Sequence, residues 1–240
     1  MGYWSKLALL GALAYGSLAA TLWAQDVIIT GRVVLEGAAH ISPASSTVVW
    51  LTPVGADASG GATVPPMHAV LRQKNKAFEP HMLVVTKGST VDFPNLDPWF
   101  HNVFSLFNGK RFDLGLYEAG TTRTVHFDRE GVSYIFCNIH PEMSAVVVVV
   151  SSQYFAIPDK QGEFAISSVP AGRYTLHVWN ENALPAALQA LSRAVDVSAA
   201  SHAVGTIHIQ VTTAPTSHKN KYGQDYEPPS SNNPVYVQPQ

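Results

Sequence analysis

Short runs rich in β-branched and apolar residues recur along the chain, and no convincing amphipathic helical pattern interrupts them. Segments rich in Gly, Pro, Ser and Ala separate the runs. The runs cover residues 27–35, 46–51, 67–72, 82–86, 90–94, 122–127, 133–137 and 145–150. Regularly spaced short strands with turn signals between them are typical of an all-β sandwich. The sequence therefore predicts an all-β fold, and we expect the apolar run 146–150 to be a strand buried on both faces.

The only cysteine of the chain lies in the segment Cys137-Asn138-Ile139-His140-Pro141-Glu142-Met143. Cysteine, histidine and methionine thus follow one another at equal spacing, and a further histidine, His101, stands upstream. One thiolate, two imidazoles and one thioether are the ligands of blue-copper electron-transfer sites. Soft sulfur suits Cu(I), and imidazole suits copper in both oxidation states. The pattern predicts a type 1 copper site with four candidate ligands, which are His101, Cys137, His140 and Met143.

Other interpretations of the same residues stay open. A lone free cysteine is most often a small buried hydrophobe, and a methionine near it is usually core filler. The chain has ten histidines, so a chance approach of histidine to cysteine is not rare. The alternatives are therefore another metal, an empty site or a purely structural cysteine. The combined spacing of all four residues favours copper over each of these.

The surrounding segments resemble the cupredoxin family. The similarity runs from about Gln25 to Ser151 and includes Val84–Phe93, Asn95–Asp97 and His101–Val103, which resemble the plastocyanin-type pattern. The short loop from Cys137 to Met143 is similar in length to that of amicyanin. The resemblance implies a cupredoxin-like Greek-key β-sandwich that binds one type 1 copper per chain.

The resemblance also implies roles for the candidate ligands. His101, Cys137 and His140 would form a trigonal set, and Met143 would be a weak axial ligand. Glu142 departs from the family pattern, because it places a carboxylate between the last two ligands. Because of Glu142, the resemblance does not indicate the reduction potential or the charge of the redox partner. It still indicates copper as the metal.

A second unit is predicted to begin near Ser152. The segments Asp159–Phe164 (Asp-x-x-Gly-x-Phe) and Val169–Tyr174 (Val-Pro-x-Gly-x-Tyr) resemble the carboxypeptidase-regulatory-like, or transthyretin-like, β-sandwich. The resemblance implies a smaller accessory sandwich without catalysis over residues 152–211. The copper domain is then expected over residues 25–151. Residues 212–240 are expected to be a disordered tail, because their Pro-, Ser- and Asn-rich composition cannot bury a core.

The first 24 residues have the pattern of a secretory signal peptide, with Lys6 before a long apolar run and Ala24 at a suitable cleavage position. An uncleaved N-terminal anchor is the alternative. The chain is therefore expected to be exported, to the periplasm or another extracytoplasmic compartment, with no membrane span in the mature chain. An unpaired cysteine in an exported protein needs an explanation, and a metal supplies one.

Composition and motifs narrow the function further. Charged residues make up 13% of the chain and the net charge is −2, which argues against nucleic-acid binding. The sequence contains no nucleophile elbow, zinc-protease motif or phosphate-binding loop. We therefore expect a non-enzymatic blue-copper protein that carries single electrons between redox protein partners. The alternatives are a periplasmic copper-binding or carrier protein and an envelope-associated binding module. The sequence does not indicate an oligomeric state.

Three finer expectations concern the surroundings of the copper. Asn102 is expected to brace the ligand loop through hydrogen bonds. His140, in the loop, is expected to be the ligand nearer to solvent and the port for electrons. Some of the aromatic side chains near His101 should form an apolar docking patch around His140; they are Trp99, Phe100, Phe104 and Phe107.

Overall fold

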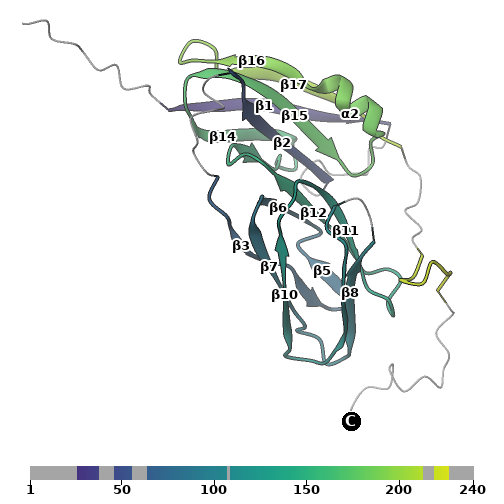
Figure 1. Cartoon of the computed structure of the whole chain (residues 1–240). Helices are drawn as coiled ribbons and strands as arrows, with labels where there is room; N and C mark the ends of the chain where they lie inside the picture. The colour runs from purple at the N-terminus through teal and green to yellow at the C-terminus, as the bar shows by residue number, and fades with distance from the viewer. Residues whose placement is uncertain (1–25, 38–45, 56–63, 107–108, 213–218, 227–240) are drawn as a thin grey trace, which may run out of the picture.

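The structure is a computed structural model that describes residues 26–37, 46–55, 64–106, 109–212 and 219–226. The described residues form strands and one short helix, α2 (Pro185–Leu191). Figure 1 shows them as two layered β-structures that lie one above the other. The predicted all-β class is therefore confirmed. All eight runs predicted from the sequence contain strands of the structure.

The first sandwich spans residues 64–151 and contains the candidate ligands. Its strands are β3 (His68–Val70), β4 (Arg72–Lys74), β5 (Ala77–Glu79), β6 (Met82–Thr86), β7 (Ser89–Pro94), β8 (His101–Ser105), β9 (Phe112–Tyr117), β10 (Thr122–Phe127), β11 (Gly131–Phe136) and β12 (Ser144–Val150). They form a sheet of order β6-β12-β11-β8-β9, a sheet of order β10-β7-β3 and the hairpin β4-β5. A shared apolar core includes Phe93, Phe127 and Ile135, which are fully buried.

The second sandwich is built from both ends of the chain. Its strands are β1 (Val27–Glu36), β2 (Thr47–Pro53), β13 (Phe155–Ala156), β14 (Glu163–Val169), β15 (Gly172–Asn180), β16 (Arg193–Val197) and β17 (Ala203–Gln210). One sheet has the order β14-β1-β17 and the other β13-β2-β15-β16. Their common core includes Ile29, Leu51, Ile166, Leu176 and Ile207.

The predicted domain boundary is wrong for residues 27–53. Strand β1 lies between β14 and β17, with Thr30 opposite both Ala165 and Ala203, and β2 lies between β13 and β15. The first two strands therefore complete the second sandwich rather than the copper domain. The alternation of apolar residues predicts that these segments are strands. It does not predict which sheet they join, because both sandwiches have room for a strand with one apolar face.

Strand β12 is buried on both faces, as predicted for residues 146–150. Successive side chains of a strand point to opposite faces. Ala145, Val147 and Val149 face the core of the first sandwich. Val146 and Val148 instead pack in a separate apolar cluster that includes Val48 and Trp179 of the second sandwich. This strand therefore joins the two sandwiches through an apolar contact.

Residues 1–24, predicted as a signal peptide, lie outside the described residues. The prediction of a disordered tail over residues 212–240 is wrong for residues 219–226, which form a hydrogen-bonded turn against the first sandwich. Within the described part of the chain, no helix has the length and apolar character needed to cross a bilayer.

An ion pair also joins the two sandwiches. The Nε2 atom of His81, just before β6, lies 2.7 Å from the Oε2 atom of Glu181, just after β15. The Nδ1 atom of His81 lies 3.2 Å from the carbonyl oxygen of Ser144. Two acceptors favour an imidazole that carries both protons. The hydrogen bond with Glu181 raises the pKa of His81 above its usual value of 6.5, although burial opposes this.

We expect Glu181→Gln to change the pH dependence of stability. Because the folded-state pKa of His81 is raised, the stabilisation is fully present below pH 6.5 and is lost as the pH rises through the folded-state pKa. The loss in unfolding free energy caused by the substitution should therefore be larger at pH ~5.5 than at pH ~9. Solvent screens this partly exposed pair and limits the loss to at most about 1 kcal/mol.

Chemical denaturation of the metal-free protein at a series of pH values measures this effect. Glu118→Gln is the matched control, because it removes a charge of the same sign from an exposed position of the first sandwich. If Glu181→Gln lowered the unfolding free energy equally at low and high pH, His81 and Glu181 would not be coupled.

Candidate metal centre

The sheet pairing brings His101 and Cys137 to the same end of the first sandwich. His101 is the first residue of β8, and Cys137 directly follows β11. These strands are neighbours and run antiparallel, with Phe136 opposite Phe104. The start of β8 and the end of β11 therefore lie at the same end of the sheet.

The loop between β11 and β12 then folds back on itself. The backbone N–H of Met143 donates to the carbonyl oxygen of His140 at 3.1 Å, and the N–H of Cys137 donates to the carbonyl oxygen of Met143 at 3.3 Å. The strand pair Phe136–Ser144 closes the loop at its base. Three candidate ligands separated by equal spacing in the sequence are thereby held close together.

The donor atoms of three predicted ligands face one another. The Nδ1 atoms of His101 and His140 are 3.1 Å apart, and the Sγ atom of Cys137 lies 3.9 Å from the first and 3.6 Å from the second. All three side chains are buried, and they are the one cluster of at least three potential metal ligands among His, Cys, Asp and Glu of the described residues. Met143, the fourth predicted ligand, is fully buried and packs in the same apolar cluster as Cys137.

These distances fit a single metal ion. First-row metal ions bind imidazole nitrogen at about 2.0 Å and thiolate sulfur at about 2.3 Å. One ion at such distances from all three atoms would hold them between 3 and 4 Å apart, as they are found. Two imidazoles, one thiolate and a buried thioether beside them match the donor set of type 1 copper.

Asp97 orients His101 from the side opposite the metal-binding nitrogen. Its Oδ2 atom accepts a hydrogen bond from Nε2 of His101 at 2.8 Å, which leaves the lone pair of Nδ1 directed at Cys137 and His140. The carboxylate is itself held by the backbone N–H groups of Asn75 and Lys76, at 2.6 and 2.8 Å. These residues form the tip of the β4–β5 hairpin, and both have positive φ angles of 55°.

Sequence reasoning missed the role of Asp97. It stands four residues before His101 in an irregular segment, where an aspartate is usual for reasons of turn chemistry alone. Only the fold shows that its side chain is buried and contacts a candidate ligand. The hydrogen bonds lower the pKa of Asp97 in spite of its burial, and the carboxylate is therefore charged at neutral pH.

Burial prepares the two histidines to bind a metal. It lowers the pKa of His140 to about 4, and it also lowers the pKa of His101, although Asp97 opposes this. Both imidazoles are therefore neutral near pH 7, and the neutral ring is the form that binds a metal. In the metal-free protein, burial raises the pKa of Cys137. Hydrogen bonds from the backbone N–H groups of Asn102, Ile139 and His140 oppose this rise. These N–H groups are placed to stabilise a thiolate.

Asn102 acts differently from the expectation. Its side chain donates to Asp113 at 2.7 Å and to the carbonyl oxygen of Gly115 at 2.9 Å, and both acceptors belong to β9. Its side chain therefore braces the neighbouring strand β9 and not the ligand loop. Only its backbone N–H is directed at the sulfur of Cys137.

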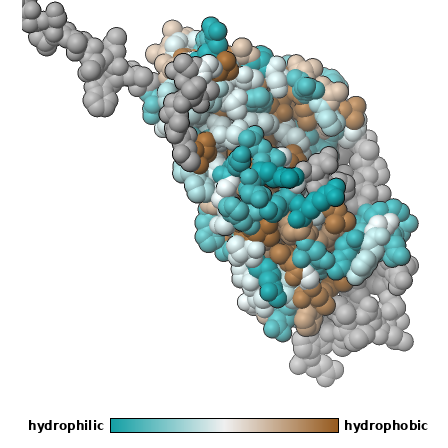
Figure 2. Space-filling model, viewed as in Figure 1, coloured by the Kyte–Doolittle hydropathy of each residue, from teal (hydrophilic) through white to brown (hydrophobic). Residues whose placement is uncertain are grey.

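The predicted difference in exposure between the two histidines is small. His140 is 4% exposed and His101 is fully buried. Among the aromatic residues of the predicted docking patch, Phe104 is buried in the core and Phe100 is 45% exposed, whereas Phe107 lies outside the described residues. Leu96, close in sequence to His101, is also exposed. Figure 2 shows apolar side chains on the viewed face of the first sandwich.

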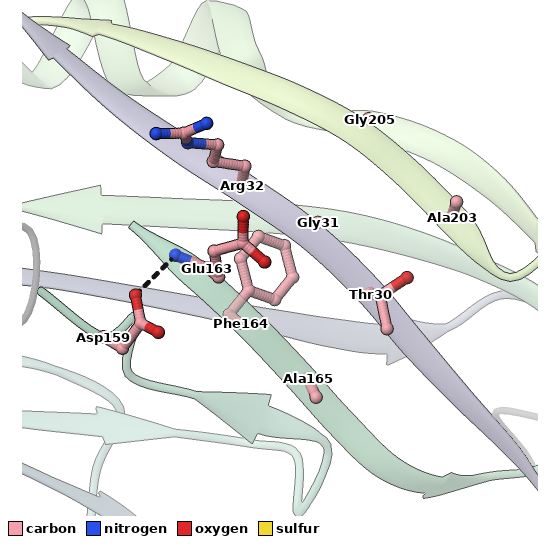
Figure 3. A pocket seen from close by; sticks show the side chains of 9 residues that line it. All are labelled: Thr30, Gly31, Arg32, Asp159, Glu163, Phe164, Ala165, Ala203 and Gly205. Carbon is pink, nitrogen blue, oxygen red and sulfur yellow. Dashed lines mark hydrogen bonds between the residues drawn. The ribbon is translucent and has the colours of Figure 1, made fainter. Parts of the chain in front are cut away.

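A separate surface hollow of about 580 Å³ lies on the second sandwich. Figure 3 shows Arg32, Asp159 and Glu163 around it, with Asp159 accepting a hydrogen bond from the backbone N–H of Glu163. The hollow runs across β1, β14 and β17. All four candidate copper ligands belong to the first sandwich, so the hollow is not part of the metal centre.

Comparisons with known proteins match parts of this chain. Residues 142–204 match the family described as polysaccharide lyase family 4, domain II. No curated protein matches the sequence. The family match lies largely on the second sandwich, and the transthyretin-like resemblance of that sandwich stays a prediction.

Several solved structures are similar to part of the chain. A purple cupredoxin from Nitrosopumilus maritimus is 26% identical, over 34% of this chain and 99% of its own, with a TM-score of 0.31. A copper-containing nitrite reductase from Thermus scotoductus SA-01 is 21% identical, over 50% of this chain and 28% of its own, with a TM-score of 0.35. A mutant of amicyanin in its reduced Cu(I) form is 24% identical, over 37% of this chain and 88% of its own, with a TM-score of 0.33. These similarities are partial, and the assignment of the metal centre rests on its own side-chain geometry.

Proposed function

We propose that this protein binds one type 1 copper ion through His101, Cys137, His140 and Met143 and carries single electrons between redox protein partners. The observation that carries the proposal is the convergence of two imidazole Nδ1 atoms and one cysteine sulfur, 3.1 to 3.9 Å apart, in a buried site. Bound copper would supply the one-electron couple.

The protein contributes rigidity to this chemistry. Asp97 fixes His101 through its Nε2–H group, and the β11–β12 loop fixes the other three ligands through its own backbone hydrogen bonds. The strand pairs at the base of the loop belong to a packed sheet. Side chains held in this way move little when the charge at the site changes, so an electron enters or leaves with little reorganisation.

The backbone N–H groups around Cys137 serve the same purpose. Those of Asn102, Ile139 and His140 are directed at its sulfur and stabilise negative charge there. Because the ligands are between 0 and 4% exposed, water is kept from the metal-binding atoms. A buried site without an exposed ligand is better suited to passing electrons than to handing over the ion. We therefore prefer electron transfer to the alternative of copper storage or delivery.

The location and the partner are part of the proposal. In this proposal the exported protein docks redox proteins through exposed apolar side chains that are close in sequence to His101, such as Leu96 and Phe100. The second sandwich would then act as an accessory module in the cell envelope. No step of this function requires a substrate to be chemically converted.

Voltammetry of the copper-loaded full-length protein tests the electron-transfer part of the proposal. We expect one reversible one-electron couple, with the visible band lost on reduction and regained on reoxidation without loss of copper. If copper leaves the protein during a single cycle of reduction and oxidation, a copper-delivery role would replace electron transfer.

A further inference from the structure

The C-terminal segment 219–226 forms a compact turn with its own hydrogen bonds. The side-chain oxygen of Asn220 accepts from the backbone N–H groups of Tyr222 and Gln224, each at 3.0 Å. Gly223 donates to the carbonyl oxygen of Asn220 and has a φ angle of 77°, which glycine adopts without strain. The turn is thus held together independently of its contacts with the rest of the protein.

This turn lies against the loop that carries the candidate ligands. The hydroxyl of Tyr226 donates to the carbonyl oxygen of Cys137 at 2.9 Å, and the backbone N–H of Lys221 donates to Oδ1 of Asn138 at 3.0 Å. Cys137 and Asn138 are the first two residues of the ligand loop. In Figure 1 the yellow segment lies beside the loop that connects β11 and β12.

A third contact ties the turn to the neighbouring strand. The ammonium group of Lys221 lies 2.9 Å from Oδ2 of Asp113 on β9. The other oxygen of the same carboxylate accepts from the side chain of Asn102 at 2.7 Å. Asn102 follows His101, and its backbone N–H is directed at the sulfur of Cys137. The segment therefore contacts the ligand loop directly and is linked through Asp113 to β8, which supplies His101.

We propose that residues 219–226 form a clamp, in which Lys221 and Tyr226 are positioning residues that hold the ligand loop closed over the metal centre. This proposal rests on the proposed copper function and adds a third chain segment to the site. The clamp sets how easily the loop opens.

The burial of the ligands explains why the clamp would matter. His101, Cys137 and Met143 are fully buried and His140 nearly so, and an ion can therefore leave only when the loop opens. Opening the loop breaks the hydrogen bond between Tyr226 and the carbonyl oxygen of Cys137. A hydrogen bond of this kind contributes about 1 kcal/mol, which corresponds to roughly a fivefold change in an opening equilibrium.

The test compares Tyr226→Phe, Lys221→Ala and the double variant with the wild-type full-length protein. Each protein is loaded with Cu(I) and mixed with an excess of the chelator bathocuproine disulfonate, and the rate of copper release is recorded. We expect release to be roughly fivefold faster for Tyr226→Phe and at least about tenfold faster for the double variant. Tyr174→Phe, which removes a tyrosine–carbonyl hydrogen bond of the same kind from the second sandwich, should release copper at the wild-type rate.

A second measurement does not depend on copper. In the metal-free protein, hydrogen exchange of the amides of Ile139 and His140 should be faster in Tyr226→Phe than in the wild type and unchanged in Tyr174→Phe. A merely structural contact would lower the unfolding free energy and leave both copper release and loop exchange unchanged, and this result would overturn the clamp. If the wild type binds no copper, the proposed function fails, and the exchange measurement alone decides the clamp.

Discussion

Cys137→Ser is expected to abolish the blue colour of the copper-loaded protein. The intense visible band of a type 1 site requires a cysteine thiolate bound to Cu(II), and Cys137 is the only cysteine of the chain. The serine hydroxyl is a poor ligand for copper and loses its proton far less readily than a thiol. We therefore expect complete loss of the visible band and weaker binding of both oxidation states. Optical spectra and competition titrations with copper chelators measure both effects.

The fold should survive this substitution. Serine is nearly the same size as cysteine, although its hydroxyl is more costly to bury without a partner. The far-ultraviolet circular dichroism of metal-free Cys137→Ser should match that of the metal-free wild type. His208→Ala, a change in an exposed residue of the second sandwich, is a suitable control and should keep the blue band. A folded Cys137→Ser variant with the wild-type visible spectrum would exclude Cys137 as a ligand.

Asp97→Asn is expected to raise the reduction potential. A buried carboxylate next to a histidine ligand stabilises Cu(II) more than Cu(I), because the oxidised ion carries the larger charge. Asparagine keeps the shape of the side chain, and its Oδ1 atom can still accept from Nε2 of His101. Mutation of a residue that hydrogen-bonds to a metal ligand typically costs about 10-fold to 100-fold in metal affinity. If mainly the affinity for Cu(II) decreases, each tenfold decrease raises the reduction potential by about 59 mV.

Voltammetry and Cu(II) competition titrations of Asp97→Asn measure these effects. Asp128→Asn is the matched control, because it removes the same charge from an exposed carboxylate that pairs with Lys110. We expect this control to leave the potential close to the wild-type value. Wild-type potential and Cu(II) affinity in Asp97→Asn would show that the negative charge of Asp97 does not act on the metal centre.

The strands and the ligand cluster could be predicted because their signals are local. Alternating or continuous apolar runs predicted the strands, including β12 with both faces buried. The close spacing of Cys137, His140 and Met143 placed three candidate ligands in one loop. His101 could be added because its residue type completes a known donor set, and the pairing of β8 with β11 brings it there.

The features that could not be predicted depend on contacts between distant parts of the chain. Strand β1 pairs with β17 and β14, but its own pattern of residues is equally suitable for a sheet of the first sandwich. No convincing amphipathic helical pattern was found in the sequence, yet the short helix α2 forms, and Pro185 occupies a favourable first position in it.

The turn at residues 219–226 is a similar case. Its polar composition indicates disorder, and its position on the first sandwich depends on hydrogen bonds to Asn138, Cys137 and Asp113, which lie 83 to 108 residues earlier in the chain. A composition-based prediction contains no information about such contacts. The burial of the Asp97 carboxylate, which depends on the tip of the β4–β5 hairpin, could not be predicted for the same reason.

The most direct test of the copper assignment is an optical titration of the metal-free full-length protein with Cu(II). The account predicts an intense visible band that grows linearly, stops at one copper per chain and disappears on reduction to Cu(I). A protein that stays colourless with one equivalent of tightly bound Cu(II), or that binds no Cu(II), would contradict the type 1 copper centre at His101, Cys137, His140 and Met143.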